Sequence, residues 1–226
     1  MRGIIHGVLF VLLIRYLFMN TSFTIKEILT LAWKKTKEHI AFLVLITLGF
    51  VIGTLLLDLL GKGTLLSLVH IVFNCFAMFT FVRMGLRFIK GENFTFNDVI
   101  AVDWKSFGLY ILGSLLFFIT YVVGFFLLII PGIIAAIRLG FFGFIMLDEH
   151  LQPVPALKKS FEMTKGHFWK LLGFAFVVGL INFAGALLAG VGMLVTAPFS
   201  LLATSYMYDR IKSLPRTETP VSTQAQ

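Results

Sequence analysis

Three ionisable residues lie inside long apolar stretches of the sequence, where charges are rare. Arg138 follows a Pro-Gly pair in PGIIAAIRLGFF, and Asp58 and His70 stand on either side of the GKG motif of an earlier stretch. A charge at the centre of a membrane helix costs about 2.5–3.5 kcal/mol on insertion scales, so each group needs a partner or a route to water. An Asp58–Arg138 ion pair would satisfy both charges. The three residues are a candidate intramembrane polar site. They either form a proton or substrate path, or are structural, with Arg138 extending to the interface and His70 hydrogen-bonded between helices.

Asp148, Glu149 and His150 form the densest cluster of titratable residues. Two carboxylates beside a histidine can perform acid–base chemistry. Acidic residues that open a solvated turn are far more common, and we favour that interpretation. The five histidines share no ligand spacing with carboxylates or with the single cysteine, Cys75, and the sequence has neither a glycine-rich phosphate loop nor a nucleophile elbow. The sequence therefore predicts no catalytic site, no metal site and no cofactor.

The segments that carry these residues belong to a largely apolar chain. Of its 226 residues, 58% are hydrophobic and only 13% are charged. Soluble domains are about half apolar and one quarter charged. The apolar runs leave no polar face that could meet water, which excludes a soluble domain. The composition predicts an all-α integral membrane protein.

The chain contains three apolar blocks, at residues 40–81, 107–147 and 168–208. Each is about twice as long as the ~20 residues that cross a bilayer once. Each also has helix breakers near its middle, which are GKG at 61–63, PG at 131–132 and GVG at 190–192. We therefore predict six transmembrane helices arranged as three hairpins.

Basic residues concentrate between and beyond the blocks, and only Lys62 lies at a mid-block turn. Because positive charge stays on the cytoplasmic side, we expect the polar segments and the C-terminus in the cytoplasm and the protein in the plasma (inner) membrane. The net charge of +8 is spread along the chain and does not form one basic domain. No nucleic-acid partner is expected.

A polar segment with one recurring frame precedes the first two blocks, as FTIKEILTLAWKK from residue 23 and FTFNDVIAVDWKS from residue 94. Apolar residues in the first copy follow helical spacing, and Thr24 with Glu27 forms a capping box. Thr95 with Asp98 forms a weaker box in the second copy. We predict an amphipathic interfacial helix before each hairpin.

The second copy is expected to continue one helical face through Ile100 to Trp104, and a third, weaker copy begins at Pro153 or Pro155. An even number of spans in each unit keeps all amphipathic helices on one side of the membrane, as in parallel repeats. The sequence predicts three repeat units, at residues 23–93, 94–150 and 151–212.

Aromatic and lysine side chains on these helices suit the headgroup boundary, where both residue types anchor proteins. The predicted anchors are Trp33, Trp104, Phe161, Lys34, Lys35, Lys159 and Lys165. We favour a role in orienting the hairpins, with binding of anionic lipid or of a partner as the alternative. The expected partners are membrane lipids, with a second copy of the chain or another membrane protein as further alternatives.

Residues 1–18 carry an apolar run too short to cross a membrane comfortably, with no small-residue cleavage site after it. We expect translation to begin at Met19 and the membrane domain to occupy residues 19–212. If residues 1–18 are translated, they form an interfacial or seventh helix. The polar tail at 213–226 is expected to be disordered and cytoplasmic.

The run PGIIAAIRLGFFGFIMLDEHLQPVPALKKSFEMTKGHFWKLLGF resembles the shared core of a superfamily of bacterial and archaeal polytopic membrane proteins. The matching features are Pro131-Gly132, Arg138, the acid at Asp148 or Glu149, Ala156-Leu157, Lys159-Ser160, Thr164-Lys165-Gly166 and Phe168-Trp169. The superfamily includes the DUF975 and UPF0259 (YciC-like) proteins and the membrane domain attached to some glycerophosphoryl diester phosphodiesterases. The resemblance covers nearly all of the chain from Met19 to about Lys212. It implies a six-helix inner-membrane protein without a settled activity, and the sequence lacks the catalytic domain of the phosphodiesterase members.

These features favour a non-enzymatic protein with a membrane-organising or accessory role in envelope lipid homeostasis. The alternative is a small permease or lipid translocator, which the repeats and Arg138 would support. A polar mid-membrane cavity around Arg138 would favour transport, whereas a close-packed bundle would favour the accessory role.

Overall fold

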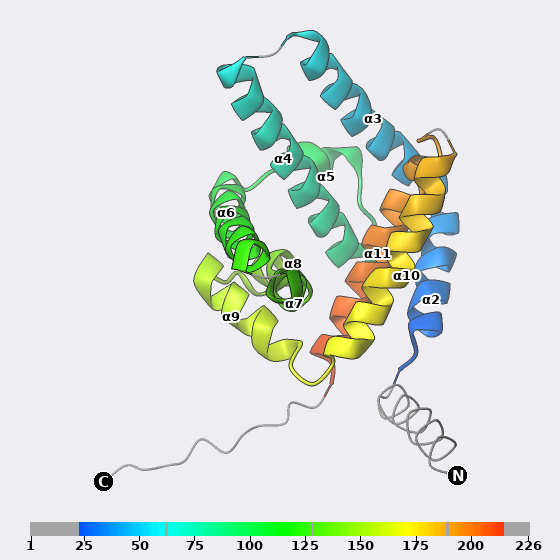
Figure 1. Ribbon diagram of the computed structural model, residues 1–226. Helices are drawn as coiled ribbons and strands as arrows, with labels where there is room; N and C mark the ends of the chain where they lie inside the picture. The colour runs from blue at the N-terminus through cyan, green and yellow to red at the C-terminus, as the bar shows by residue number, and fades with distance from the viewer. Residues whose placement is uncertain (1–22, 62, 128, 189, 215–226) are drawn as a thin grey trace, which may run out of the picture.

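The computed structural model describes residues 23–61, 63–127, 129–188 and 190–214, and within these ranges it contains helices and turns but no strand (Figure 1). The predicted all-α fold is confirmed for this part of the chain. Its helices are α2 (Ile25–Glu38), α3 (Ile40–Leu59), α4 (Thr64–Ile89), α5 (Phe96–Ile100), α6 (Trp104–Leu127), α7 (Ile129–Leu139), α8 (Phe142–Glu149), α9 (Pro153–Met163), α10 (Phe168–Leu187) and α11 (Met193–Lys212). The expectations for residues 1–18 and for most of the tail lie outside the described residues.

Five helical segments are long and apolar enough to cross a membrane, which supports a multi-pass membrane protein. They are Ile40–Leu59, Thr64–Ile89, Trp104–Phe126, Ile130–Glu149 and Phe168–Leu187. The fourth segment consists of α7 and α8, which are separated by a turn at Gly140 and Phe141. The expected sixth span, α11, is 20 residues long, as α10 is, but it is too polar to count among the five membrane-spanning segments.

The polarity of α11 is explained by its central position. It packs against α2, α3, α4 and α10, and Figure 1 shows it beside α10 with α2 along the pair. Leu202, Met207, Tyr208 and Ser205 are fully buried in these contacts. Because much of its surface meets protein, α11 can carry serines, threonines and tyrosines that would be costly on a helix facing lipid.

Glycine forms the bends of the first and third hairpins, as predicted. Gly61 and Gly190 have φ of +116° and +78°, a conformation that other residues rarely adopt. The prediction that Pro131-Gly132 forms the second bend is wrong, because both residues lie in the first turn of α7. A proline there removes no helical hydrogen bond. Gly132 allows α7 to approach α6, since a Cβ at this position would lie 2.9 Å from the Cα of Phe125.

The predicted starts of the amphipathic helices are confirmed. In α2, the hydroxyl of Thr24 accepts a hydrogen bond from the backbone N–H of Glu27 at 3.2 Å. In α5 the capping box is complete, because Asp98 also accepts a hydrogen bond from the backbone N–H of Thr95 at 2.8 Å. α9 begins at Pro153, where the missing N–H has no consequence.

The predicted single face through Ile100 to Trp104 is wrong, because α5 ends at Ile100 and a new helix follows. The carboxylate of Asp103 accepts hydrogen bonds from the backbone N–H groups of Lys105 at 3.1 Å and Ser106 at 3.3 Å. This N-cap starts α6 at Trp104, so the chain turns between the two residues.

Each amphipathic helix packs mainly on a hairpin other than the one that follows it. α2 lies against α11, and α9 lies against α6, α7 and α8. α5 lies beside the first hairpin, where the rings of Phe96 and Phe42 are 5.1 Å apart between centroids. The amphipathic helices therefore connect the hairpins to one another.

Candidate functional site

The three residues of the predicted intramembrane site lie in two separate places. His70 Nδ1 is 3.4 Å from Asp58 Oδ1, near the bend between α3 and α4. Arg138 lies near the end of α7, where its guanidinium is 4.6 Å from the ring centroid of Phe161 in α9. The Asp58–Arg138 ion pair suggested by the sequence is not formed. The two hairpins point in different directions (Figure 1), and Arg138 is at the opposite end of its helix from the bend.

Arg138 marks the point where α9 supports the break between α7 and α8. The hydroxyls of Ser160 and Thr164 donate hydrogen bonds to the backbone carbonyl of Arg138 at 2.7 and 3.3 Å. Both hydroxyl residues are fully buried. A carbonyl at the end of a helix has no partner within that helix, so α9 supplies the missing donors. Within the described residues, the buried Nε of Arg138 has no hydrogen-bond partner.

Asp148 is the centre of an ionic cluster that joins three hairpins. Its side chain is only 8% exposed, and its carboxylate is 2.8 Å from Nζ of Lys90, the C-cap of α4, and 2.5 Å from Lys212 Nζ of α11. The hydroxyl of Tyr208 donates a third hydrogen bond at 3.0 Å. The favoured interpretation of Asp148 as an acid in a solvated turn is therefore wrong, because the ends of α4, α8 and α11 converge around it.

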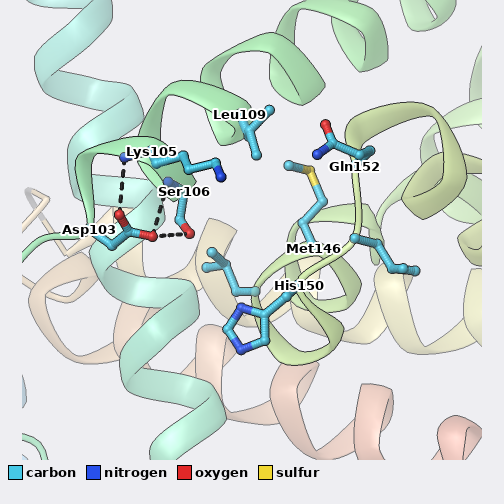
Figure 2. Close-up of a pocket in the computed structure, with 9 residues that line it drawn as sticks. Asp103, Lys105, Ser106, Leu109, Met146, His150 and Gln152 are labelled. Atoms are coloured by element: carbon cyan, nitrogen blue, oxygen red, sulfur yellow. Dashed lines mark hydrogen bonds between the residues drawn. The ribbon is translucent and has the colours of Figure 1, made fainter.

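The adjacent Glu149 and His150 do not join Asp148 in an acid–base site. Glu149 forms an ion pair with Lys159 of α9 and lies 3.6 Å from Lys212. His150 is exposed and has a left-handed backbone with φ of 52°. It lines a different cavity of about 230 Å³ beside the start of α6, together with Asp103 (Figure 2).

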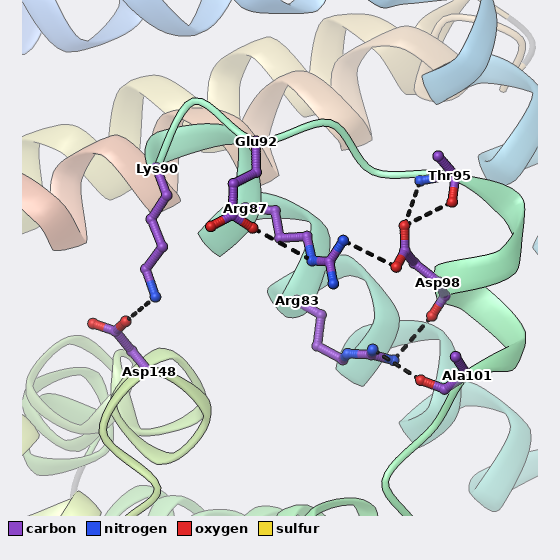
Figure 3. Close-up of polar contacts among 8 residues, drawn as sticks. All are labelled: Arg83, Arg87, Lys90, Glu92, Thr95, Asp98, Ala101 and Asp148. Carbon is purple, nitrogen blue, oxygen red and sulfur yellow. Dashed lines mark hydrogen bonds and ion pairs between the residues drawn. The ribbon is translucent and has the colours of Figure 1, made fainter.

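Each amphipathic helix is tied by one ion pair to the hairpin on which it packs. Arg210 Nη2 of α11 is 2.6 Å from Glu27 of α2, and Arg87 Nη1 of α4 is 2.9 Å from Asp98 of α5 (Figure 3). In the third pair, Glu149 at the end of α8 meets Lys159 of α9, so here the amphipathic helix carries the base and the hairpin carries the acid. The sequence analysis missed these partners. The acid three residues after the N-caps of α2 and α5 was visible, but nothing in the sequence identifies which distant arginine each acid meets.

α5 is held by a second arginine of α4. Arg83 donates hydrogen bonds to the backbone carbonyls of Asp98 at 3.1 Å and Ala101 at 3.0 Å, which lie at the end of this short helix (Figure 3). At its start, hydrogen bonds from the hydroxyl and the backbone N–H of Thr95 hold the pKa of the Asp98 carboxyl below its usual value. Both ends of α5 are therefore satisfied by polar contacts.

Most of the predicted anchors are exposed, including Trp33 and Phe161, and several of them also contact other side chains of the protein. Trp104, Lys34 and Lys165 are exposed, whereas Lys35 pairs with Glu38 at 2.9 Å. Further contacts join Trp33 to Phe199, Trp104 to Phe107, Phe161 to Arg138 and Lys159 to Glu149.

A second cavity, an open groove of about 470 Å³, lies between α2 and the α10–α11 hairpin. Its lining residues are Ile25, Lys26, Leu29, Thr30, Trp33, Val177 and Phe199. Neither cavity is lined by Arg138, Asp58 or His70. Within the described ranges, no three His, Cys, Asp or Glu side chains lie close enough together to hold a metal ion. No family model, curated protein or solved structure gave a significant match to the chain.

Proposed function

We propose that the protein is a non-enzymatic, multi-pass protein of the plasma membrane with an accessory, membrane-organising role in envelope lipid homeostasis. The Asp148 cluster is the observation that carries this proposal. Lys90, Asp148 and Lys212 join the ends of α4, α8 and α11 in one ion-paired group. Alternating-access transport requires parts of a bundle to move apart at each face in turn. A closed ionic cluster at one end favours a static scaffold instead.

The proposal includes six spans in three hairpins, with α11 as the sixth span and the polar helices in the cytoplasm. The bend at Gly190 supports this, because α11 runs back beside α10, which is long and apolar enough to cross. The positive-inside rule supports the orientation. The three units, and membership of the DUF975 and UPF0259 superfamily, are part of the same proposal.

A lipid translocator is the second candidate, because several polar side chains lie between α10 and α11. Asn182 donates a hydrogen bond to Ser200 Oγ at 2.8 Å. Within the described residues, Asn182 Oδ1 and Thr196 Oγ1 are buried without a hydrogen-bond partner. Polar groups between membrane helices are costly unless satisfied, and they often mark substrate paths.

Fluorescent-lipid bleaching in proteoliposomes separates the two candidates. The accessory role predicts that dithionite bleaches the same fraction of labelled lipid with the protein as in empty liposomes. Additional bleaching that Asn182→Leu abolishes would establish the translocator and overturn the accessory role. In cells, we expect loss of the protein to change the envelope phospholipid composition. Wild type and Asn182→Leu should restore that composition, whereas Asp148→Ala should not.

A further inference from the structure

The groove between α2 and the α10–α11 hairpin combines an apolar lining with a cationic flank. The Trp33 ring, 45% exposed, meets Phe199 edge-on at 5.9 Å between centroids. Lys37 Nζ lies 5.9 Å from the centroid of the same Trp33 ring. Lys26 and Thr30 are the polar residues that line the groove. One side chain, Trp33, therefore belongs both to the apolar lining and to the cationic flank.

Among the described residues, the lysines of this flank have no carboxylate partner. Both acids of α2 are engaged elsewhere, since Glu27 pairs with Arg210 and Glu38 pairs with Lys35. Lys26 and Lys37 are exposed, and neither forms an ion pair with any described residue. An anion from outside the chain would find, beside an apolar groove, two positive charges that no described carboxylate compensates.

The two lysines lie along one row of the helix surface. Lys26, Thr30, Trp33 and Lys37 are spaced i, i+4, i+7 and i+11, which places them on one flank of an α-helix. Lys34 of the same helix is also exposed and lies outside this row. The row therefore sets two of the exposed lysines of α2 apart from a third.

The surroundings of the groove identify its occupant. On α10, next to Val177 of the groove, Phe176 and Leu180 are large, apolar and exposed, so this face meets hydrocarbon in a membrane. A phospholipid carries both an acyl chain for the groove and a phosphate for the lysines. We propose that the groove binds one anionic phospholipid of the inner leaflet, with an acyl chain against Trp33 and Val177 and its headgroup at Lys26 and Lys37. This assignment rests on the proposed membrane role and orientation.

Quenching of Trp33 by brominated phospholipids tests the site. The full chain, with Trp104→Phe and Trp169→Phe so that Trp33 is the single emitter, is reconstituted in phosphatidylcholine containing brominated phosphatidylglycerol or brominated phosphatidylcholine. We expect brominated phosphatidylglycerol to occupy the groove, and so quench Trp33, at a lower mole fraction than brominated phosphatidylcholine. The expected difference in apparent affinity is about five-fold for each lysine that meets the headgroup. High salt should reduce this preference, because it screens the lysines.

Charge-matched variants distinguish a site from a general surface potential. The double variant Lys26→Gln, Lys37→Gln should bring the ratio of apparent affinities for the two brominated lipids close to one. Lys34→Gln with Lys158→Gln removes the same charge outside the row and should leave the preference in place. Equal loss in both pairs, a ratio of one in the parent protein, or no quenching by either lipid would overturn the proposal. Lipid translocation by a protein that keeps the preference would overturn the accessory role and leave this site standing.

Discussion

Replacing Asp148 by alanine tests whether the ionic cluster holds the hairpins together. Its carboxylate, 8% exposed, meets Lys90 and Lys212, which are 51% and 37% exposed. Because both lysines reach water, each contact is worth only about 0.5–1 kcal/mol. Tyr208 is fully buried, and its hydroxyl would lose its acceptor, at a cost of about 1–3 kcal/mol. The two lysine contacts and the tyrosine hydrogen bond together predict that Asp148→Ala lowers the free energy of unfolding by about 2–5 kcal/mol.

Asp148→Asn separates these contributions. The amide oxygen still accepts the hydrogen bond from Tyr208, so only the ionic part is lost and the expected cost is about 1–2 kcal/mol. Asp209→Asn is the matched control, because this neighbouring acid is exposed and forms no ion pair with a described residue. The assay is unfolding in mixed micelles with increasing dodecyl sulfate, followed by circular dichroism. Equal stability of the Asp148→Ala and Asp209→Asn proteins would refute the reasoning.

Three further predictions concern packing, pH and topology. Gly85→Ala should destabilise the protein by about 1–3 kcal/mol, because the new Cβ would lie 2.0 Å from Ser205 Oγ, and Ser205→Ala should restore part of the loss in the same unfolding assay. Asp98 has a lowered pKa, so its stabilisation of α5 should be present above the unfolded value of about 3.9 and disappear as the pH falls through the folded value. Hydrogen exchange of α5 should show this loss in the wild type and a smaller loss in Thr95→Ala, which removes the hydroxyl donor but keeps the backbone N–H and the Arg87 ion pair. In a Cys75→Ser background, a membrane-impermeant maleimide should label Gly63→Cys from outside intact cells only, and labelling from the cytoplasm would contradict the proposed orientation.

Local sequence signals were sufficient where a few neighbouring residues decide the structure. Thr24 and Thr95 start α2 and α5 as predicted, because an N-cap needs only a hydroxyl and the next backbone N–H groups. Gly61 and Gly190 form bends because residues other than glycine rarely adopt their φ. Pro131 misled the prediction, since a proline is equally acceptable in the first turn of a helix and at a bend.

The candidate sites depended on contacts between distant parts of the chain. Asp148 meets Lys90 and Lys212, which lie 58 residues before and 64 residues after it. Arg138 rests on Phe161 and not on Asp58, because α9 folds back over the break after α7. No spacing in the sequence indicates these partners.

Sequence alone was enough to predict the membrane class, the helical character and the starts of α2, α5 and α9, because length, apolarity and capping act over a few residues. The tertiary structure decided which hairpin each amphipathic helix joins, why α11 can be polar, and which charges are paired. These features depend on how the hairpins pack, and a burial or ion-pair partner exists only once distant surfaces meet.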